Sequence, residues 1–153
     1  MPGKPLSTSD GADRPARGVP MFPGRLCYGL CFLGFLALAV YGSLVPFAYR
    51  PLPTDEALRR WREIPYLTLG VHSRADFVAN ILLFVPLGFT LLGSLALDRR
   101  AWVGLAAAPF AAALLFGLSL AVEFAQIYFP PRTVSVNDIV AETAGAVLGV
   151  ALW

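Results

Sequence analysis

Residues 77–97 have the sequence FVANILLFVPLGFTLLGSLAL, a run of 21 residues without a charged side chain. An α-helix rises 1.5 Å per residue, so about 20 apolar residues cross the ~30 Å hydrocarbon core of a bilayer. Similar apolar runs cover residues 26–49 and 101–129, the latter with one acid, and a shorter run with two acids near its start covers 137–153. The sequence therefore predicts four transmembrane helices, at about 26–49, 77–97, 101–129 and 137–153.

The composition of the whole chain agrees with a small multi-pass membrane protein. Of its 153 residues, 57% are hydrophobic and 14% are charged, whereas soluble domains have roughly 45–50% and about 25%. The formal net charge is only +2, without the clustered basic face that nucleic-acid binding needs, so no nucleic-acid partner is expected. A transmembrane β-barrel would need alternating strands of ~10 residues. The runs are instead continuous and rich in Leu, Ala and Gly, which predicts an all-α fold.

The remaining segments are a tail and a loop. Residues 1–24 contain five prolines and four glycines, which predicts a disordered tail ahead of a transmembrane domain at 25–153. In the loop, Thr54 precedes Asp55 and Glu56 and is expected to cap a short helix over 54–63. We expect this helix to lie at the membrane interface with Trp61 as an aromatic anchor, and an ordinary solvated connector is the alternative.

Antiparallel spans place the end of the first and third spans beside the start of the second and fourth. Nearly all polar residues of the spans occur in these four places, and within a span they are three or four positions apart, so they share one helix face. The loops at this end add arginines. The sequence therefore predicts a polar pocket on one membrane face, made of Asp76, Asn80, Glu123, Gln126, Arg132, Asp138 and Glu142.

Membrane orientation is not decided by the basic residues, because six lie on each side of the predicted bilayer. The tight turn at Asp98, Arg99 and Arg100 is typical of a cytoplasmic hairpin and favours an N-terminus inside the cell. The pocket would then face outward.

The predicted depth of the charged residues in the membrane indicates that the pocket has a function. A charge at membrane depth costs at least ~2.5–3.5 kcal/mol on insertion scales, so such groups face the bundle interior and mark function. Glu123 lies roughly 9 Å along the helix from the predicted span end. The structural alternative is that Asp76 and Asp138 satisfy helix N-termini and that Asn80 and Gln126 bond neighbouring helices.

Small residues predict where helices approach closely. Ala141, Gly145 and Gly149 form one row on the fourth span, and a similar row on the third span contains Ala113, Gly117, Ala121 and Ala125. Cys27 and Cys31 are four apart on an apolar helix with no further ligands nearby, so they are expected to be packing or lipid-facing residues and not a metal site.

The polar and small residues together resemble the VanZ-like family of membrane proteins. The resemblance covers about residues 40–153 and rests on the motifs Asp76-x-x-x-Asn80-x-x-x-Phe84-x-Pro86-Leu87-Gly88, Glu123-x-x-Gln126, Arg132-x-x-Ser135-x-x-Asp138 and Glu142-x-x-Gly145-x-x-x-Gly149. It implies a multi-pass protein of the bacterial cytoplasmic membrane. The founding member is associated with resistance to teicoplanin, a lipid-tailed glycopeptide. Glu142 departs from the family, which often has Asn there.

Three functions remain open at this point. The preferred one is a non-enzymatic protein, without a cofactor, whose pocket recognises a membrane lipid or lipid-linked envelope component. Arg132 and Arg74 would contact its phosphate, and the carboxylates would contact a cationic or hydroxyl-rich part or hold a hard divalent cation. The second is a membrane-embedded enzyme with paired carboxylates as acid and base. The third is a structural partner whose polar residues serve helix packing.

Overall fold

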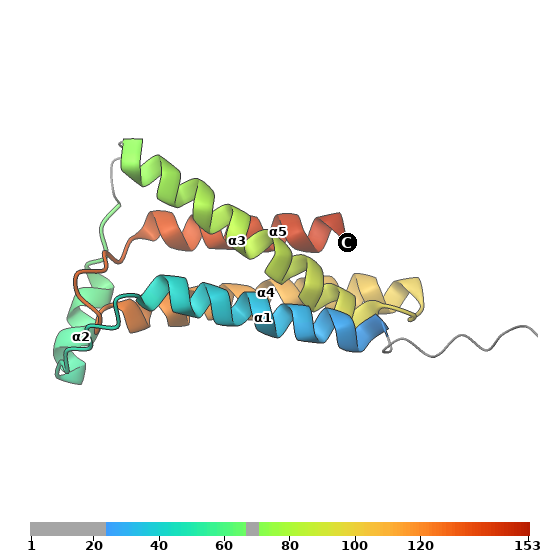
Figure 1. The fold of residues 1–153 in the computed structure, drawn as a ribbon, viewed down its shortest axis with the longest axis horizontal. Helices are drawn as coiled ribbons and strands as arrows, with labels where there is room; N and C mark the ends of the chain where they lie inside the picture. Colours follow the sequence, from blue (N-terminus) through green and yellow to red (C-terminus); the bar gives the residue numbers. More distant parts are fainter. Residues whose placement is uncertain (1–23, 67–70) are drawn as a thin grey trace, which may run out of the picture.

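The computed structural model describes residues 24–66 and 71–153, and within these ranges all regular structure is helical. A tight turn at residues 97–100 joins two of the long helices, and a short helix lies in the loop that follows the first long helix (Figure 1). The helices are α1 (Gly24–Leu44), α2 (Thr54–Arg62), α3 (Val71–Ala96), α4 (Ala101–Gln126) and α5 (Val136–Leu152). The predicted tail at 1–24 lies outside the described residues apart from Gly24, which begins α1.

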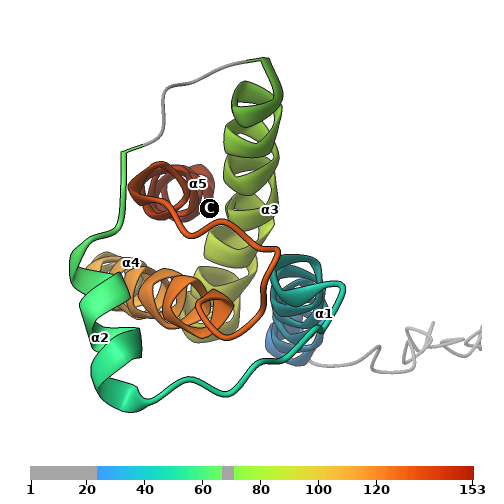
Figure 2. The ribbon, with the colours of Figure 1, turned by 90° about the vertical axis from the view of Figure 1, so that its left-hand side faces the viewer.

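Helices α1, α3, α4 and α5 run antiparallel to their chain neighbours, and α2 lies across one end of them (Figures 1 and 2). At this α2 end, α1 ends at Leu44 and α4 at Gln126, while α3 begins at Val71 and α5 at Val136. The opposite end holds the start of α1, the α3–α4 turn and the end of α5. The ends of the first and third predicted spans and the starts of the second and fourth therefore meet at one end of the bundle, as predicted from the sequence.

Three helices are long and apolar enough to cross a membrane, over Gly24–Leu44, Arg74–Ala96 and Ala101–Gln126. The fourth, α5, has 17 residues and is shorter than these. Large apolar side chains point outward along the bundle, and Leu105 is 79% exposed. Exposed apolar surface of this kind in a chain this poor in charge is what lipid would cover.

The predicted span ends need three corrections. Helix α1 ends at Leu44 and not at residue 49, because Pro46 has no N–H with which to continue the helical hydrogen bonds. Helix α3 begins at Val71 and not at 77, so Asp76 lies in its second turn. Helix α4 ends at Gln126 and not at 129, since residues 127–129 donate to carbonyls three residues back in turns.

The core lies where α3 packs against its neighbours, and its most extensive contact is with α5. Phe84, Leu87 and Leu115 are buried in the central cluster. At the α3–α5 crossing the two backbones touch: a Cβ on Gly145 would collide with the Ile81 carbonyl, and one on Gly149 with the Val85 carbonyl. The small-residue row of α5 is thus confirmed as a close-approach surface.

The small-residue row predicted on α4 is wrong as a packing surface. A Cβ on Gly117 would meet nothing within 4 Å, and Ala113 and Ala121 are exposed. The row faces away from the bundle because α4 turns its Ala111, Leu115 and Ser119 side inward. Cys27 and Cys31 are exposed free thiols on α1, as expected for lipid-facing residues.

At the bundle end away from α2, an arginine and an aromatic pair hold α1 against α3. Arg25 donates from Nε to the Ser94 carbonyl (3.1 Å) and from Nη2 to the Leu95 carbonyl (3.3 Å). These carbonyls lie in the last turn of α3, where the helix leaves them without N–H partners and a cation is favourable. Tyr28 packs against Phe89 with ring centroids 5.9 Å apart. Asp98 takes a positive φ of 59° in the α3–α4 turn.

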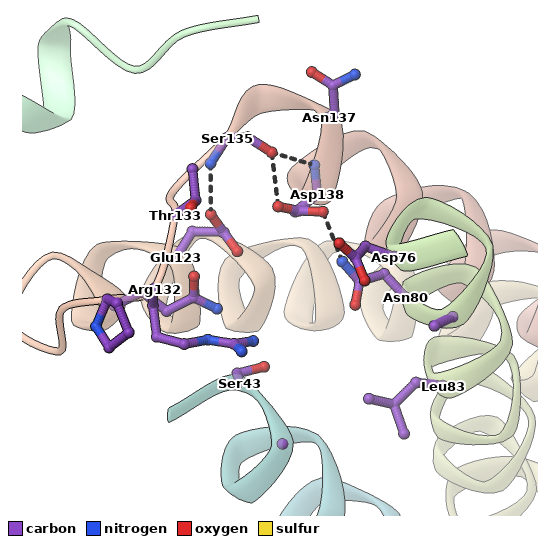
Figure 3. A pocket seen from close by; sticks show the side chains of 14 residues that line it. Ser43, Asp76, Asn80, Leu83, Glu123, Arg132, Thr133, Ser135, Asn137 and Asp138 are labelled. Carbon is purple, nitrogen blue, oxygen red and sulfur yellow. Dashed lines mark hydrogen bonds between the residues drawn. The ribbon is translucent and has the colours of Figure 1, made fainter. Parts of the chain in front are cut away.

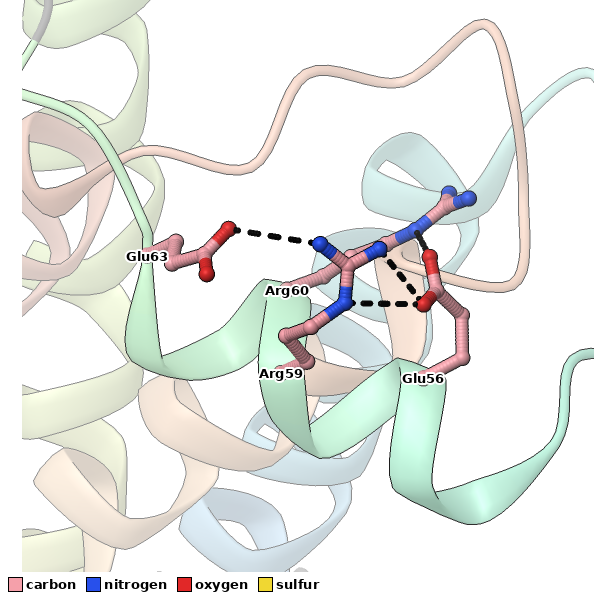
Figure 4. Close-up of polar contacts among 4 residues, drawn as sticks. All are labelled: Glu56, Arg59, Arg60 and Glu63. Atoms are coloured by element: carbon pink, nitrogen blue, oxygen red, sulfur yellow. Dashed lines mark hydrogen bonds and ion pairs between the residues drawn. The ribbon is translucent and has the colours of Figure 1, made fainter.

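Helix α2 confirms the predicted short helix but corrects its cap. Thr54 is the first helical residue, and Pro53 occupies the cap position without a side-chain hydrogen bond. Trp61 fixes α2 to the end of α4 through an edge contact with Phe124, at 5.5 Å between centroids. On the outer side, the Glu56 carboxylate accepts from Arg59 (2.7 and 3.0 Å) and Arg60 (2.8 Å) (Figure 4).

Candidate functional site

A cavity of about 440 Å³ lies at the α2 end, among α1, α3, α4, α5 and the α4–α5 loop (Figure 3). It is lined mainly by polar side chains. Six of the seven residues predicted from the sequence line it: Asp76, Asn80, Glu123, Gln126, Arg132 and Asp138. The predicted constellation therefore comes together around one space, with Glu142 as the exception.

The wall of the cavity at the start of α5 is built by an N-cap. Ser135 Oγ accepts from the Asp138 backbone N–H (3.2 Å) and donates to Asp138 Oδ2 (2.7 Å). The other oxygen of the same carboxylate, Oδ1, accepts from Asn80 Nδ2 of α3 (2.8 Å). The cap thus ties α5 to α3 and orients the Asp138 carboxylate along the cavity (Figure 3).

Glu123 completes the cap from another helix. In a capping box, the residue three after the cap accepts the cap's own backbone N–H. Here Asp138 is bound to Asn80 and the Ser135 hydroxyl, and Glu123 Oε2 of α4 accepts from Ser135 N instead (3.1 Å). Glu123 is 1% exposed. One carboxylate therefore locks the α5 N-terminus onto α4 while it lines the cavity.

Glu142 does not line the cavity. It is 1% exposed, and its Oε2 accepts from Ser119 Oγ of α4 at 2.6 Å. This pair lies one turn further along α5 than Asp138 and joins α4 to α5 inside the bundle. In the structure Glu142 has a partner within the protein, so its place in the site remains a prediction.

The side chains of three cavity-lining residues form no hydrogen bond or ion pair within the described part of the chain. Arg132, from the α4–α5 loop, forms no ion pair within 4 Å, and neither does Asp76 of α3. Gln126 is only 5% exposed and its side-chain amide makes no hydrogen bond there. Arg132 and Asp76 are exposed, and the Gln126 amide is not among the fully buried atoms that lack a partner. All three groups are therefore accessible to a ligand in the cavity.

Several sequence expectations concern residues elsewhere. Arg74, expected beside Arg132, lies in the first turn of α3 and is not among the described residues that line the cavity. Among the described residues, no group of three His, Cys, Asp or Glu residues is placed to hold a metal ion.

The cavity also has polar lining residues that were not predicted as site residues: Ser43, Thr133, Ser135 and Asn137. The Ser135-x-x-Asp138 spacing is that of a helix N-cap and its partner, so Ser135 could have been found from the sequence. Nothing in the sequence indicates Thr133, because its place depends on the path of the α4–α5 loop.

The comparison with protein families gives one match, to the model described as VanZ/LLP1, over residues 28–153. The chain belongs to the VanZ/LLP1 family. The match begins near the start of α1 and includes the cavity and all seven predicted residues, so it extends further than the motifs that suggested it. The VanZ assignment from those motifs is confirmed. No curated protein and no solved structure matched this chain.

Proposed function

We propose that this VanZ-family protein is a non-enzymatic, multi-pass protein of the bacterial cytoplasmic membrane, in which α5 is the fourth crossing. Family membership and the three long apolar helices support a membrane protein. The 17 residues of α5 extend about 26 Å, close to the ~30 Å hydrocarbon core. Its antiparallel packing along α3 supports the same crossing.

The function of the cavity, in this proposal, is to recognise the headgroup of a membrane lipid or lipid-linked envelope component. The observation that carries it is Arg132, a guanidinium that lines a cavity at the bundle end without an ion pair among the described residues. Guanidinium groups bind phosphate through paired hydrogen bonds. The unpaired amide of Gln126 supplies further donors to the same space.

The test is binding of fluorescent phospholipids to the purified full-length protein in detergent. The substitution Arg132→Gln keeps a polar side chain and changes an exposed residue whose guanidinium forms no ion pair among the described residues, so the protein should still fold. We expect binding to weaken by roughly tenfold, the size of one charge-assisted contact. The matched control is Arg99→Gln in the α3–α4 turn. Equal binding by wild type and Arg132→Gln would contradict the proposal.

A cellular role follows from the same proposal. The VanZ resemblance links the family to teicoplanin, whose lipid tail places it at the membrane surface. We expect a deletion strain to change its susceptibility to teicoplanin, and expect the wild-type gene to restore it while the Arg132→Gln gene does not. Identical susceptibility of the deletion strain and the two complemented strains would contradict a role in glycopeptide resistance.

A further inference from the structure

The cavity has opposite charges on different elements that do not meet. Arg132 enters from the α4–α5 loop, and Asp76 enters from α3 (Figure 3). They line one space, yet no ion pair joins them within 4 Å. Side chains as long as arginine pair readily with a neighbouring carboxylate when geometry allows. The space between them therefore suits a ligand that carries both charges.

The charge balance of the lining excludes a simple anion as the best ligand. Among the described residues that line the cavity, Arg132 is the only base, and it faces the carboxyl groups of Asp76, Glu123 and Asp138. Phosphate alone would gain from Arg132 but would be repelled by Asp76 and Asp138. A phosphate with an ammonium group a few bonds away would satisfy both sides.

Gln126 supplies a second polar group to the same cavity, and its amide atoms are not among the fully buried atoms without a partner. It is 95% buried, it lines the cavity, and its amide has no hydrogen-bond partner in the described chain. It lies in the last turn of α4, just ahead of the loop that carries Arg132. An amide N–H next to a guanidinium is a suitable donor pair for phosphate oxygens.

On the side between α1 and α3, the lining of the cavity includes small residues as well as Leu83 of α3. Gly42 of α1 and Ala79 of α3 both line the cavity and are exposed. A Cβ on Gly42 would meet nothing within 4 Å. The two helices diverge toward the α2 end (Figures 1 and 2). A lipid could keep its acyl chains outside the bundle here while its headgroup enters the cavity past Leu83.

We propose that the cavity binds the zwitterionic phosphate–ammonium headgroup of a membrane lipid that enters between α1 and α3. Arg132 and Gln126 bind the phosphate, and Asp76 with Asp138 binds the ammonium. This inference rests on the proposed function and makes it specific. Headgroup recognition by Arg132 alone would favour any phospholipid, whereas the facing carboxylates select the one that carries an amine.

The experiment measures binding of two acyl-labelled lipids, phosphatidylethanolamine and phosphatidylglycerol, to purified full-length protein. Wild type is expected to prefer phosphatidylethanolamine by roughly tenfold, as one charge contact supplies. The substitution Asp76→Asn removes that preference without weakening phosphatidylglycerol binding, while Arg132→Gln weakens both lipids. Asp76 is exposed and unpaired among the described residues, so Asp76→Asn is expected to fold.

A second arm distinguishes a membrane lipid from a free headgroup. Gly42→Trp should block the labelled lipid but leave binding of O-phosphoethanolamine, a soluble headgroup, intact. The matched control is Gly34→Trp, at another α1 glycine with nothing within 4 Å of its Cβ and away from the cavity. Equal loss of lipid binding in both variants would overturn entry between α1 and α3. Failure of O-phosphoethanolamine to displace either lipid would overturn the headgroup assignment.

The outcomes for the two proposals can be separated. If wild type binds phosphatidylglycerol as tightly as phosphatidylethanolamine and Arg132→Gln weakens both, the zwitterion inference is wrong and lipid recognition stands. If wild type binds neither lipid, both proposals are wrong. If O-phosphoethanolamine binds and neither lipid competes with it, the ligand is a soluble amine phosphate and the membrane source is wrong.

Discussion

The two ends of the bundle treat their polar groups differently. At the end away from α2, Arg25 donates hydrogen bonds to the Ser94 and Leu95 carbonyls, so its guanidinium is paired within the chain. At the α2 end, Arg132, Asp76 and Gln126 line a cavity without a partner among the described residues. Of these two arginines, Arg25 completes the helix packing, whereas Arg132 forms no ion pair among the described residues. Closing a bundle end therefore does not require the groups that the α2 end leaves unpaired.

This difference argues against a purely structural role for the whole polar cluster. Ser135, Asp138, Asn80 and Glu123 do serve packing, because their hydrogen bonds join α3, α4 and α5. A cluster built only for packing would have no need of Arg132, Asp76 and Gln126, whose side chains form no hydrogen bond or ion pair among the described residues. The cluster is thus a rigid frame of paired groups that presents a smaller set of unpaired ones.

The largest effect is expected where the α3 and α5 backbones touch. In Gly149→Val the new side chain must displace the Val85 carbonyl, and a helix backbone does not yield as a flexible side chain does. We expect a loss of about 3 kcal/mol or more in the free energy of unfolding, at or above the upper range for overpacked sites. Thermal unfolding in detergent measures it.

The matched control for that variant is Gly117→Val on α4, where nothing lies within 4 Å of the added Cβ. Both changes carry the same helix-propensity difference, so only the packing differs. If the two variants unfold at the same temperature, the close crossing of α3 and α5 does not hold the bundle together.

The second-largest effect on stability is expected at the hydrogen bond between Glu123 and the Ser135 backbone at the α2 end. Glu123→Leu leaves the Ser135 backbone N–H without its acceptor in a buried position, which should cost roughly 1–3 kcal/mol of unfolding free energy. Glu123→Gln keeps an amide oxygen that can accept the same N–H and should cost less. Chemical denaturation of both variants checks the order. Equal losses would mean that the Ser135 hydrogen bond does not stabilise the α5 N-terminus.

A smaller pair of changes separates the two ends directly. Arg25→Met removes two hydrogen bonds from the α3 C-terminus and should lower the unfolding free energy by about 1 kcal/mol, with lipid binding unchanged. Arg132→Gln should weaken lipid binding with unfolding unchanged. Unfolding and binding are measured for both variants. A loss of binding in Arg25→Met, or of stability in Arg132→Gln, would remove the functional distinction between the ends.

Much of the fold could be predicted from hydropathy, because apolar runs report helix length and number. The ends of α1 and α4 could not, since a run such as 26–49 continues through Pro46, where the helical hydrogen bonds stop. The small-residue rows show another limit. The row with Gly145 packs and the row with Gly117 does not, and spacing alone is the same for both. Which face of a membrane helix turns inward is set by its neighbours.

Six cavity residues could be predicted because antiparallel topology groups the polar span ends without knowledge of side-chain geometry. The partnering within the group could not. Asp138 and Asn80 share a hydrogen bond, Glu142 is paired with Ser119, and Arg132 is left unpaired. These differences depend on the helix rotations and on the path of the α4–α5 loop, and they determine which residues are available to a ligand.

The smallest effect is expected on α2, outside the spans. Hydrogen bonds from Arg60 and Arg59 hold the pKa of Glu56 below its ordinary value of 4.5. The folded state thus favours the ionised carboxylate, and its contribution is present above pH 4.5 and is lost as the pH falls through the lowered pKa. Because Trp61 of α2 packs on Phe124, its fluorescence should change in that acidic range, in a background with Trp102 and Trp153 replaced by Phe. Glu56→Gln should lack this step, and added salt should weaken it in wild type because Arg59 and Arg60 are exposed and Glu56 is partly exposed. A step of equal size in Glu56→Gln would assign the acid response to another carboxylate, such as those of the α2-end cavity.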